Sequence, residues 1–190
     1  MQHAKRSFFW LILLTAIAST ILLVREVKPV HQHDQALRDQ IPDQFMWDVT
    51  ATKFDEQGVR TSKLYSPHVI HYPKDDTSTL TTPKITIYRA PDPAWYIQAK
   101  HGTTRQGTTI IHLTDDVRIH QAAGKNNHET TLLTQALSFY PDRHFAETDK
   151  PVTMFQPGSY VNATGMQADF INNWVKLLSN ARGDYAPTKH

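Results

Sequence analysis

Apolar and polar residues alternate along most of the chain beyond residue 42, and one alternating unit occurs twice. Residues 47–51 read Trp-Asp-Val-Thr-Ala, residues 95–99 read Trp-Tyr-Ile-Gln-Ala, and in both cases a Val follows the Ala by 18 positions, at Val69 and Val117. Weaker copies occupy residues 132–136 and 163–168. Successive side chains of a strand point to opposite faces, so the alternation predicts strands with one apolar face. Its recurrence predicts a stacked or wrapped β structure.

Short segments rich in Gly, Pro, Asp and Asn separate the alternating runs and predict turns. Gly58 and Gly165 are the predicted turn glycines, and Asp115-Asp116 is read as a hairpin turn. No helical periodicity follows residue 42, so we expect an all-β sandwich or roll of antiparallel strands. The predicted strands are Phe45–Phe54, Thr61–Tyr65, His68–Tyr72, Leu80–Tyr88, Trp95–His101, Thr108–Leu113, Val117–Gln121, Leu132–Tyr140, Phe145–Phe155, Tyr160–Phe170 and Trp174–Ala181.

Strand parity places one set of apolar residues on a common face, opposite a polar face that includes Thr50, Gln98 and Arg118. The small Ala at two strand ends leaves room inside, which serves either close packing of the sheets or space for a guest molecule. The set is Val49, Ala51, Ile85, Ile87, Ile97, Ala99, Val117, Ile119, Leu137 and Phe139. These residues are candidates for a binding groove and, equally, for plain core.

A basic head at residues 1–6 precedes an uncharged apolar run at residues 7–24. As a helix this run is about 27 Å long, close to the thickness of a bilayer core. A signal-peptidase site after Ala18 is the alternative, but the apolar run continues past it to Val24. We therefore expect an uncleaved transmembrane helix at 7–24, a linker at 25–42, an exported domain at 43–185 and a tail at 186–190.

The composition and the absence of known motifs exclude several classes of function. The 190 residues are 39% hydrophobic and 20% charged with a net charge of +2, which is ordinary for a folded domain and poor for nucleic-acid binding. There is no Cys, so thiol chemistry and disulfides are excluded. Eleven His show no metal-ligand spacing, and the hydrolase, nucleotide-binding and dinucleotide-binding motifs do not occur. We expect no catalytic residue, no metal and no cofactor.

The final alternating run has little protection against pairing with another chain. Trp174, Val175, Lys176, Leu177 and Leu178 contain one Lys and no Pro. An edge strand of this kind presents unpaired N–H and C=O groups, which can accept a strand from a partner.

The order of these segments resembles the LptC family of lipopolysaccharide export proteins of Gram-negative bacteria. The resemblance rests on the basic head and apolar segment, the Trp47–Ala51 run with Gly58, and residues 82–87 before Trp95–Ala99. It continues through residues 116–119 and 159–165. It implies a twisted, open β-jellyroll in the periplasm, anchored in the inner membrane by one helix.

The resemblance also implies the partners. Lipopolysaccharide would come from the LptB–LptF–LptG transporter and pass along the groove to LptA. The edge at Trp47, Val49 and Ala51 would meet LptF, and the edge at Trp174–Leu178 would meet LptA. Three alternatives stay open: a membrane-tethered adaptor that binds only protein, a metalloenzyme, and a sugar-binding module that uses Trp95, Tyr96 and Trp174.

Overall fold

The computed structural model describes residues 41–105, 107–125 and 127–185. The chain divides between Ile41 and Pro42, and the second unit contains the strands described below. The expected head, transmembrane helix, most of the linker and the tail lie outside the described residues. Within the described ranges, no helix is long and apolar enough to cross a bilayer.

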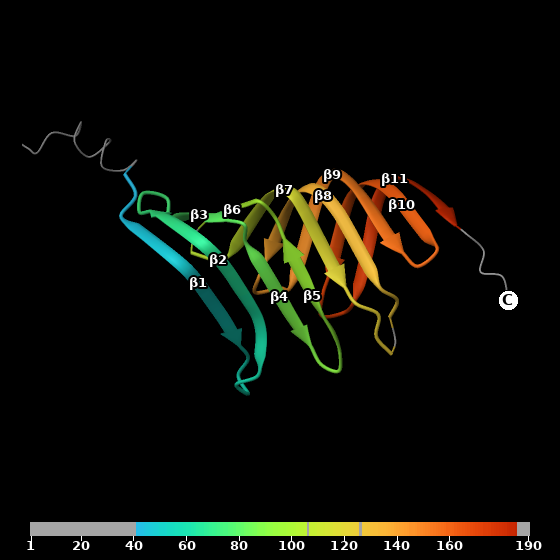
Figure 1. The fold of residues 1–190 in the computed structure, drawn as a ribbon, viewed down its shortest axis with the longest axis horizontal. Helices are drawn as coiled ribbons and strands as arrows, with labels where there is room; N and C mark the ends of the chain where they lie inside the picture. The colour runs from blue at the N-terminus through green and yellow to red at the C-terminus, as the bar shows by residue number, and fades with distance from the viewer. Residues whose placement is uncertain (1–40, 106, 126, 186–190) are drawn as a thin grey trace, which may run out of the picture. The chain divides into compact units, whose positions relative to one another are not determined.

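The described residues form one antiparallel sheet of eleven strands, which confirms the all-β prediction. β1 lies at one end of the sheet and β11 at the other (Figure 1). They are β1 (Gln44–Phe54), β2 (Arg60–Tyr72), β3 (Thr77–Thr81), β4 (Lys84–Arg89), β5 (Asp92–Gln98), β6 (His101–Arg105), β7 (Ile110–Gln121), β8 (Thr130–Tyr140), β9 (Phe145–Gln156), β10 (Ser159–Asp169) and β11 (Trp174–Tyr185).

The pairing shows that the long strands serve two layers. One half of β2 pairs with β4 and the other half with β3, while one half of β7 pairs with β5 and the other with β6. The short strands β4 and β5 therefore lie in one layer and the short strands β3 and β6 in the other, and the long strands pass from one layer to the other. We call the layer that contains β4 and β5 the first layer, and the layer that contains β3 and β6 the second layer.

The bends between the layers coincide with residues of positive φ. Asp48 in β1 has φ of 49°, Thr82 between β3 and β4 has 41°, and Gly165 in β10 has 79°. Asp115 and Asp116 in β7 have 64° and 53°, and the β7–β8 register shifts between Thr114 and Val117. A bulge bends a strand and increases its twist, so this row of irregular residues folds the sheet over on itself.

Buried hydroxyl groups hydrogen-bond the carbonyl oxygens that the bends remove from the ladder. The Ser66 hydroxyl lies 2.8 Å from both the His68 and the Thr81 carbonyl oxygens, and its side chain is buried. The Thr134 hydroxyl donates to the Pro151 carbonyl at 2.9 Å. Because an unpaired buried carbonyl costs free energy, these two residues make the bends of β2 and β9 tolerable inside the domain.

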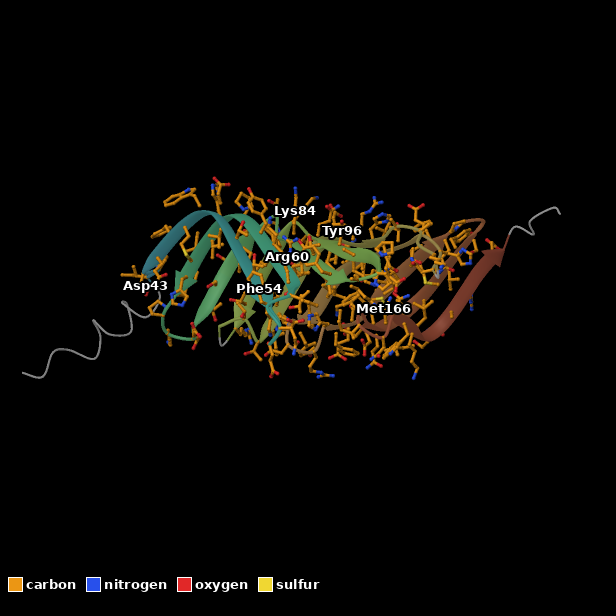
Figure 2. All side chains as sticks on the ribbon, turned by 90° about the horizontal axis from the view of Figure 1, so that it is seen from below. Asp43, Phe54, Arg60, Lys84, Tyr96 and Met166 are labelled. Carbon is orange, nitrogen blue, oxygen red and sulfur yellow. The ribbon has the colours of Figure 1, made fainter. Side chains whose placement is uncertain are left out.

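One apolar core fills the space between the layers. Ile87, Leu113, Ile119, Leu132 and Phe170 are fully buried within it. Met166 belongs to the same core, toward the end of the sheet that carries β11 (Figure 2). The predicted apolar face is therefore the interior of a two-layer sandwich.

Several predicted element limits are wrong for the same physical reason. Asp115-Asp116 is a bulge inside continuous β7 rather than a hairpin turn, and β2 continues through Pro67. The run 80–88 is two strands, β3 and β4, divided at Thr82-Pro83. Turn-forming residues inside these runs mark bends between layers, and turn chemistry alone does not distinguish a bend from a chain reversal.

Candidate functional site

Eight of the ten predicted groove residues lie in the buried core, where they pack against one another. They are Ile85, Ile87, Ile97, Ala99, Val117, Ile119, Leu137 and Phe139. The other two are on β1, where Val49 is partly buried against the core and Ala51 is exposed. The middle of the sandwich is thus filled by its own side chains.

A cleft of about 240 Å³ opens beside β1. The first layer contributes Ala51, Leu64 and Ile85, and the second contributes Ile111, Phe139 and Pro141. Its remaining lining is Thr52, Lys53, Ser62 and Thr108. The buried part of the lining is apolar except for Ser62, and Thr52, Lys53 and Thr108 are exposed at the rim. The volume is below the range of about 300–1,000 Å³ typical of small-molecule pockets, so it accommodates a chain segment rather than a whole lipid.

Three polar contacts join the two layers along the side opposite the bends, which we call the mouth. The Lys53 ammonium of β1 pairs with Asp142 in the β8–β9 turn. The Arg89 guanidinium donates from Nε to the Ile171 carbonyl at 2.8 Å. These contacts cross the mouth from the end of one layer to the turns of the other, and together they oppose separation of the layers.

The third mouth contact joins Trp95 to Asn173 and lies beside a buried aromatic cluster. The Trp95 indole donates to Asn173 Oδ1 at 3.3 Å, and its ring lies 5.3 Å from that of Phe170. Phe170 also lies 6.1 Å from Phe139 and is fully buried. A second cleft, of about 270 Å³, adjoins this cluster and is lined in part by Trp95, Met154 and Val175.

The first edge of the sheet is β1, which pairs with β2 along its length and with no other strand in the described ranges. Trp47 is 67% exposed and packs edge-on against His68, with ring centroids 6.4 Å apart. Trp95, its counterpart in the repeat, is buried at 3%. The positive φ of Asp48 explains the difference, because it breaks the alternation and turns Trp47 away from the face that carries Val49.

The second edge is β11, which pairs with β10 and has no other neighbouring strand among the described residues. Trp174 is 40% and Leu178 is 47% exposed, and Lys176 is exposed as well. Val175 and Leu177 are partly buried against the core. The strand runs to Tyr185, four residues beyond its predicted end.

Both predicted turn glycines have positive φ, but only Gly58 is in a turn. Gly58 has φ of 77° in the turn that follows β1, with its N–H donating to the Asp55 carbonyl at 3.1 Å. Gly165 lies inside β10, where the pairing with β9 and β11 is irregular. A Cβ added at Gly165 would lie 3.0 Å from Leu178 Cδ1, so this bulge seats the edge strand closely.

His71 links the start of β1 to the β2–β3 connection. Its Nδ1 lies 2.6 Å from Asp43 and its Nε2 lies 3.1 Å from Asp76. Hydrogen bonds to the Asp43 and then the Asp76 carboxylate raise the pKa of the imidazole above its ordinary value. The protonated ring donates to both carboxylates and so fastens the edge strand.

Other ion pairs stand at the bends. His101 contacts Asp115 at 2.9 Å, and Lys100 pairs with Asp116. The hydrogen bond from His101 lowers the pKa of Asp115, despite an opposing effect of burial. The described residues contain no cluster of three or more His, Asp or Glu side chains placed to hold a metal ion.

The mouth contacts were not predicted from the sequence. Lys53 and Asp142 are 89 positions apart, and Trp95 and Asn173 are 78 apart. Nothing in the local pattern marks them, since a Lys at a strand end and an Asp in a turn are common surface residues. Only the direction in which the sheet folds brings these pairs together.

Taken together, these features define a two-layer β-sandwich with an apolar interior, a cleft beside β1 and two edge strands that each pair on one side only within the described residues. Residues 10–186 match the family described as "Lipopolysaccharide-assembly, LptC-related". The chain belongs to this LptC-related family, as its sequence pattern indicated, and its role is in lipopolysaccharide transport.

Among solved structures, the chain is similar to LptH from Pseudomonas aeruginosa, described as the LptA-homologous periplasmic component of the conserved lipopolysaccharide transport device. The identity is 8% and the TM-score 0.41, with 79% of this chain and 99% of the other covered. No curated protein matches the sequence.

Proposed function

We propose that this protein is an inner-membrane-anchored, periplasmic transfer protein that accepts lipopolysaccharide from the LptB–LptF–LptG transporter and passes it to LptA. The observation that carries the proposal is the pair of free edges at opposite ends of one sheet, with an apolar interior between them. A strand added at each edge extends the sheet through main-chain hydrogen bonds. The partners' interiors would then continue the apolar path.

The cleft beside β1 supports entry of lipid at that end. Burial of acyl chains stabilises them by about 0.8 kcal/mol per methylene, so a lipid in transit needs cover from water at every step. The rim of the cleft is polar, which suits an amphiphile whose sugar and phosphate groups stay outside. Passage beyond the cleft requires the layers to part at the mouth, because core side chains fill the middle.

A second candidate, a tethered adaptor that binds only protein, is favoured by that same filled core. Ile97 and Val117 are each 1% exposed, which leaves no preformed slot at their positions. The two functions differ in whether a lipid ever contacts the cleft. A photo-crosslinking side chain at Leu64 or Ile85 should capture lipopolysaccharide under the transfer proposal and should capture none if the protein is an adaptor alone.

Docking at the β11 edge is tested by proline substitution on the full chain. Consecutive N–H groups of a strand point to opposite sides, so of Val175→Pro and Lys176→Pro one removes an outward N–H and the other an N–H directed at β10. The outward variant should lose binding of LptA while its melting temperature stays near that of the parent. The other should lose stability.

Two further variants complete the test. Deletion of residues 174–190 should abolish LptA binding and preserve docking to the transporter. Lys63→Pro, in β2 between β1 and β4, is the control for general damage to the sheet, because it removes an N–H of an interior strand. Retained LptA binding by the deletion variant, or by both single proline variants, would contradict docking at this edge.

A further inference from the structure

The cleft beside β1 has an ion pair at its rim. Lys53 lines the cleft and pairs with Asp142, directly after the lining residue Pro141. The partners come from opposite layers, β1 in one and the β8–β9 turn in the other. The pair therefore spans the mouth at the point where the apolar floor of Leu64, Ile85 and Phe139 begins.

This ion pair can exchange its partner readily. The two side chains are 45% and 69% exposed, and exposed pairs are held weakly because water screens them. The Lys53 ammonium lowers the pKa of Asp142, so the carboxylate is fully ionised at neutral pH. Burial, and after it the Lys53 ammonium, lowers the pKa of nearby His144.

We propose that Lys53 binds the phosphate of a phosphorylated acyl amphiphile whose chain enters the cleft, and that Asp142 is the resting partner that the phosphate displaces. This inference rests on the proposed transfer function. An ammonium group donates three hydrogen bonds and binds phosphate as a point charge. The charged head would stay at the rim while the chain covers the floor, which matches the distribution of polar and apolar lining.

Exchange at Lys53 opens the mouth at one end only. The Arg89–Ile171 and Trp95–Asn173 contacts lie elsewhere along the mouth and do not involve Lys53 or Asp142. They keep the layers joined while the β1 end parts. The ion pair thus acts as a latch that a phosphorylated lipid releases and that neutral lipids leave closed.

The latch predicts opposite effects for its two partners. In the full chain in detergent micelles, Lys53→Gln should weaken binding of lysophosphatidic acid about tenfold, equivalent to ~1.4 kcal/mol. Asp142→Asn frees Lys53 and should tighten binding of the same probe. Lys53→Arg keeps the positive charge and should therefore bind the probe about as well as the parent does. Monoacylglycerol of the same chain length, which lacks the phosphate, should not lose affinity in Lys53→Gln. Lys63→Gln, on the same pair of strands but outside the cleft lining, is the matched control and should bind as the parent does.

Lipopolysaccharide and its enzymatically dephosphorylated form separate the two sources of lipid phosphate. Loss of affinity in Lys53→Gln for intact lipopolysaccharide, but not for the dephosphorylated form, assigns the site to the transported lipid. The same loss for lysophosphatidic acid alone assigns it to a phospholipid. Equal behaviour of all variants, or weakening by both Lys53→Gln and Asp142→Asn, overturns the latch and leaves the transfer function standing. Failure of the parent chain to bind any of these lipids overturns both.

Discussion

Gly165 and Gly58 offer a matched pair of substitutions that measures how tightly the edge strand β11 is seated. Their φ angles are 79° and 77°, so Ala at either position meets the same backbone penalty of about 1–2 kcal/mol. They differ in space, because a Cβ at Gly58 has no neighbour within 4 Å whereas one at Gly165 lies 3.0 Å from Leu178 Cδ1. Moving Leu178 off its preferred rotamer adds about 0.5–1.5 kcal/mol.

We therefore expect Gly58→Ala to lower the free energy of unfolding by about 1–2 kcal/mol and Gly165→Ala by about 1.5–3.5 kcal/mol. Urea unfolding of the full chain, followed by fluorescence of its four Trp, measures both. A double-mutant cycle with Leu178→Ala should remove most of the excess at Gly165, where only the Cβ of residue 178 remains close, at 3.3 Å, and should leave Gly58→Ala unchanged. Equal destabilisation by the two glycine variants, or no coupling to Leu178, would refute close seating of β11 on the β10 bulge.

Three further substitutions probe the mouth, the bends and the first edge. Phe170→Ala should cost about 3–5 kcal/mol in urea unfolding because the ring is fully buried between Trp95 and Phe139, and a loss under 1 kcal/mol would show that the cluster is loosely packed. Ser66→Ala should lower the free energy of unfolding by about 1–3 kcal/mol, because two carbonyl oxygens lose a buried donor. Ser179→Ala, at an exposed position, is the control and should lower it by less than about 0.5 kcal/mol. Similar losses in the two variants would contradict the proposed role of the buried hydroxyl. His71 has a raised folded pKa, so the stability it adds is fully present below its unfolded pKa of about 6.5 and is lost as pH rises through the folded value. The stability difference between the parent and His71→Asn should accordingly shrink from about pH 5 to about pH 9, and a difference that grows with pH would exclude the carboxylate contacts as its cause.

Local alternation predicted most of the strands and the buried face of the central ones, but it missed β6 and the outward position of Trp47. Ile85, Ile87, Ile97, Val117 and Ile119 all lie inside, as their parity required. The pattern could not reveal that single strands serve two layers. A bulge such as Asp115-Asp116 and a tight turn use the same residue types, and only long-range pairing decides between them.

The sequence was sufficient to predict the exposed edge strand β11, but not the contacts that join the two layers at the mouth. The absence of Pro and the single Lys in residues 174–178 marked β11 as an open edge before its position in the sheet was known. Lys53, Arg89 and Trp95 acquire their cross-layer partners from the fold of the sheet, over separations of 78 to 89 residues. Such contacts carry no local signal, because each residue taken alone suits an ordinary surface or core position.

If lipid passes between layers that part at the mouth, a covalent tether across the mouth should block its passage. The chain has no native Cys, so Lys53→Cys with Asp142→Cys can be joined by a cleavable bis-maleimide and released by reductant. The tethered protein and the protein with the cleaved linker both lack the ion pair, so any difference in transfer between them is caused by the tether. We predict that transfer of lipopolysaccharide from the transporter to LptA stops in the tethered protein and resumes after cleavage. Equal transfer rates before and after cleavage would show that lipid crosses without separation of the layers at the mouth.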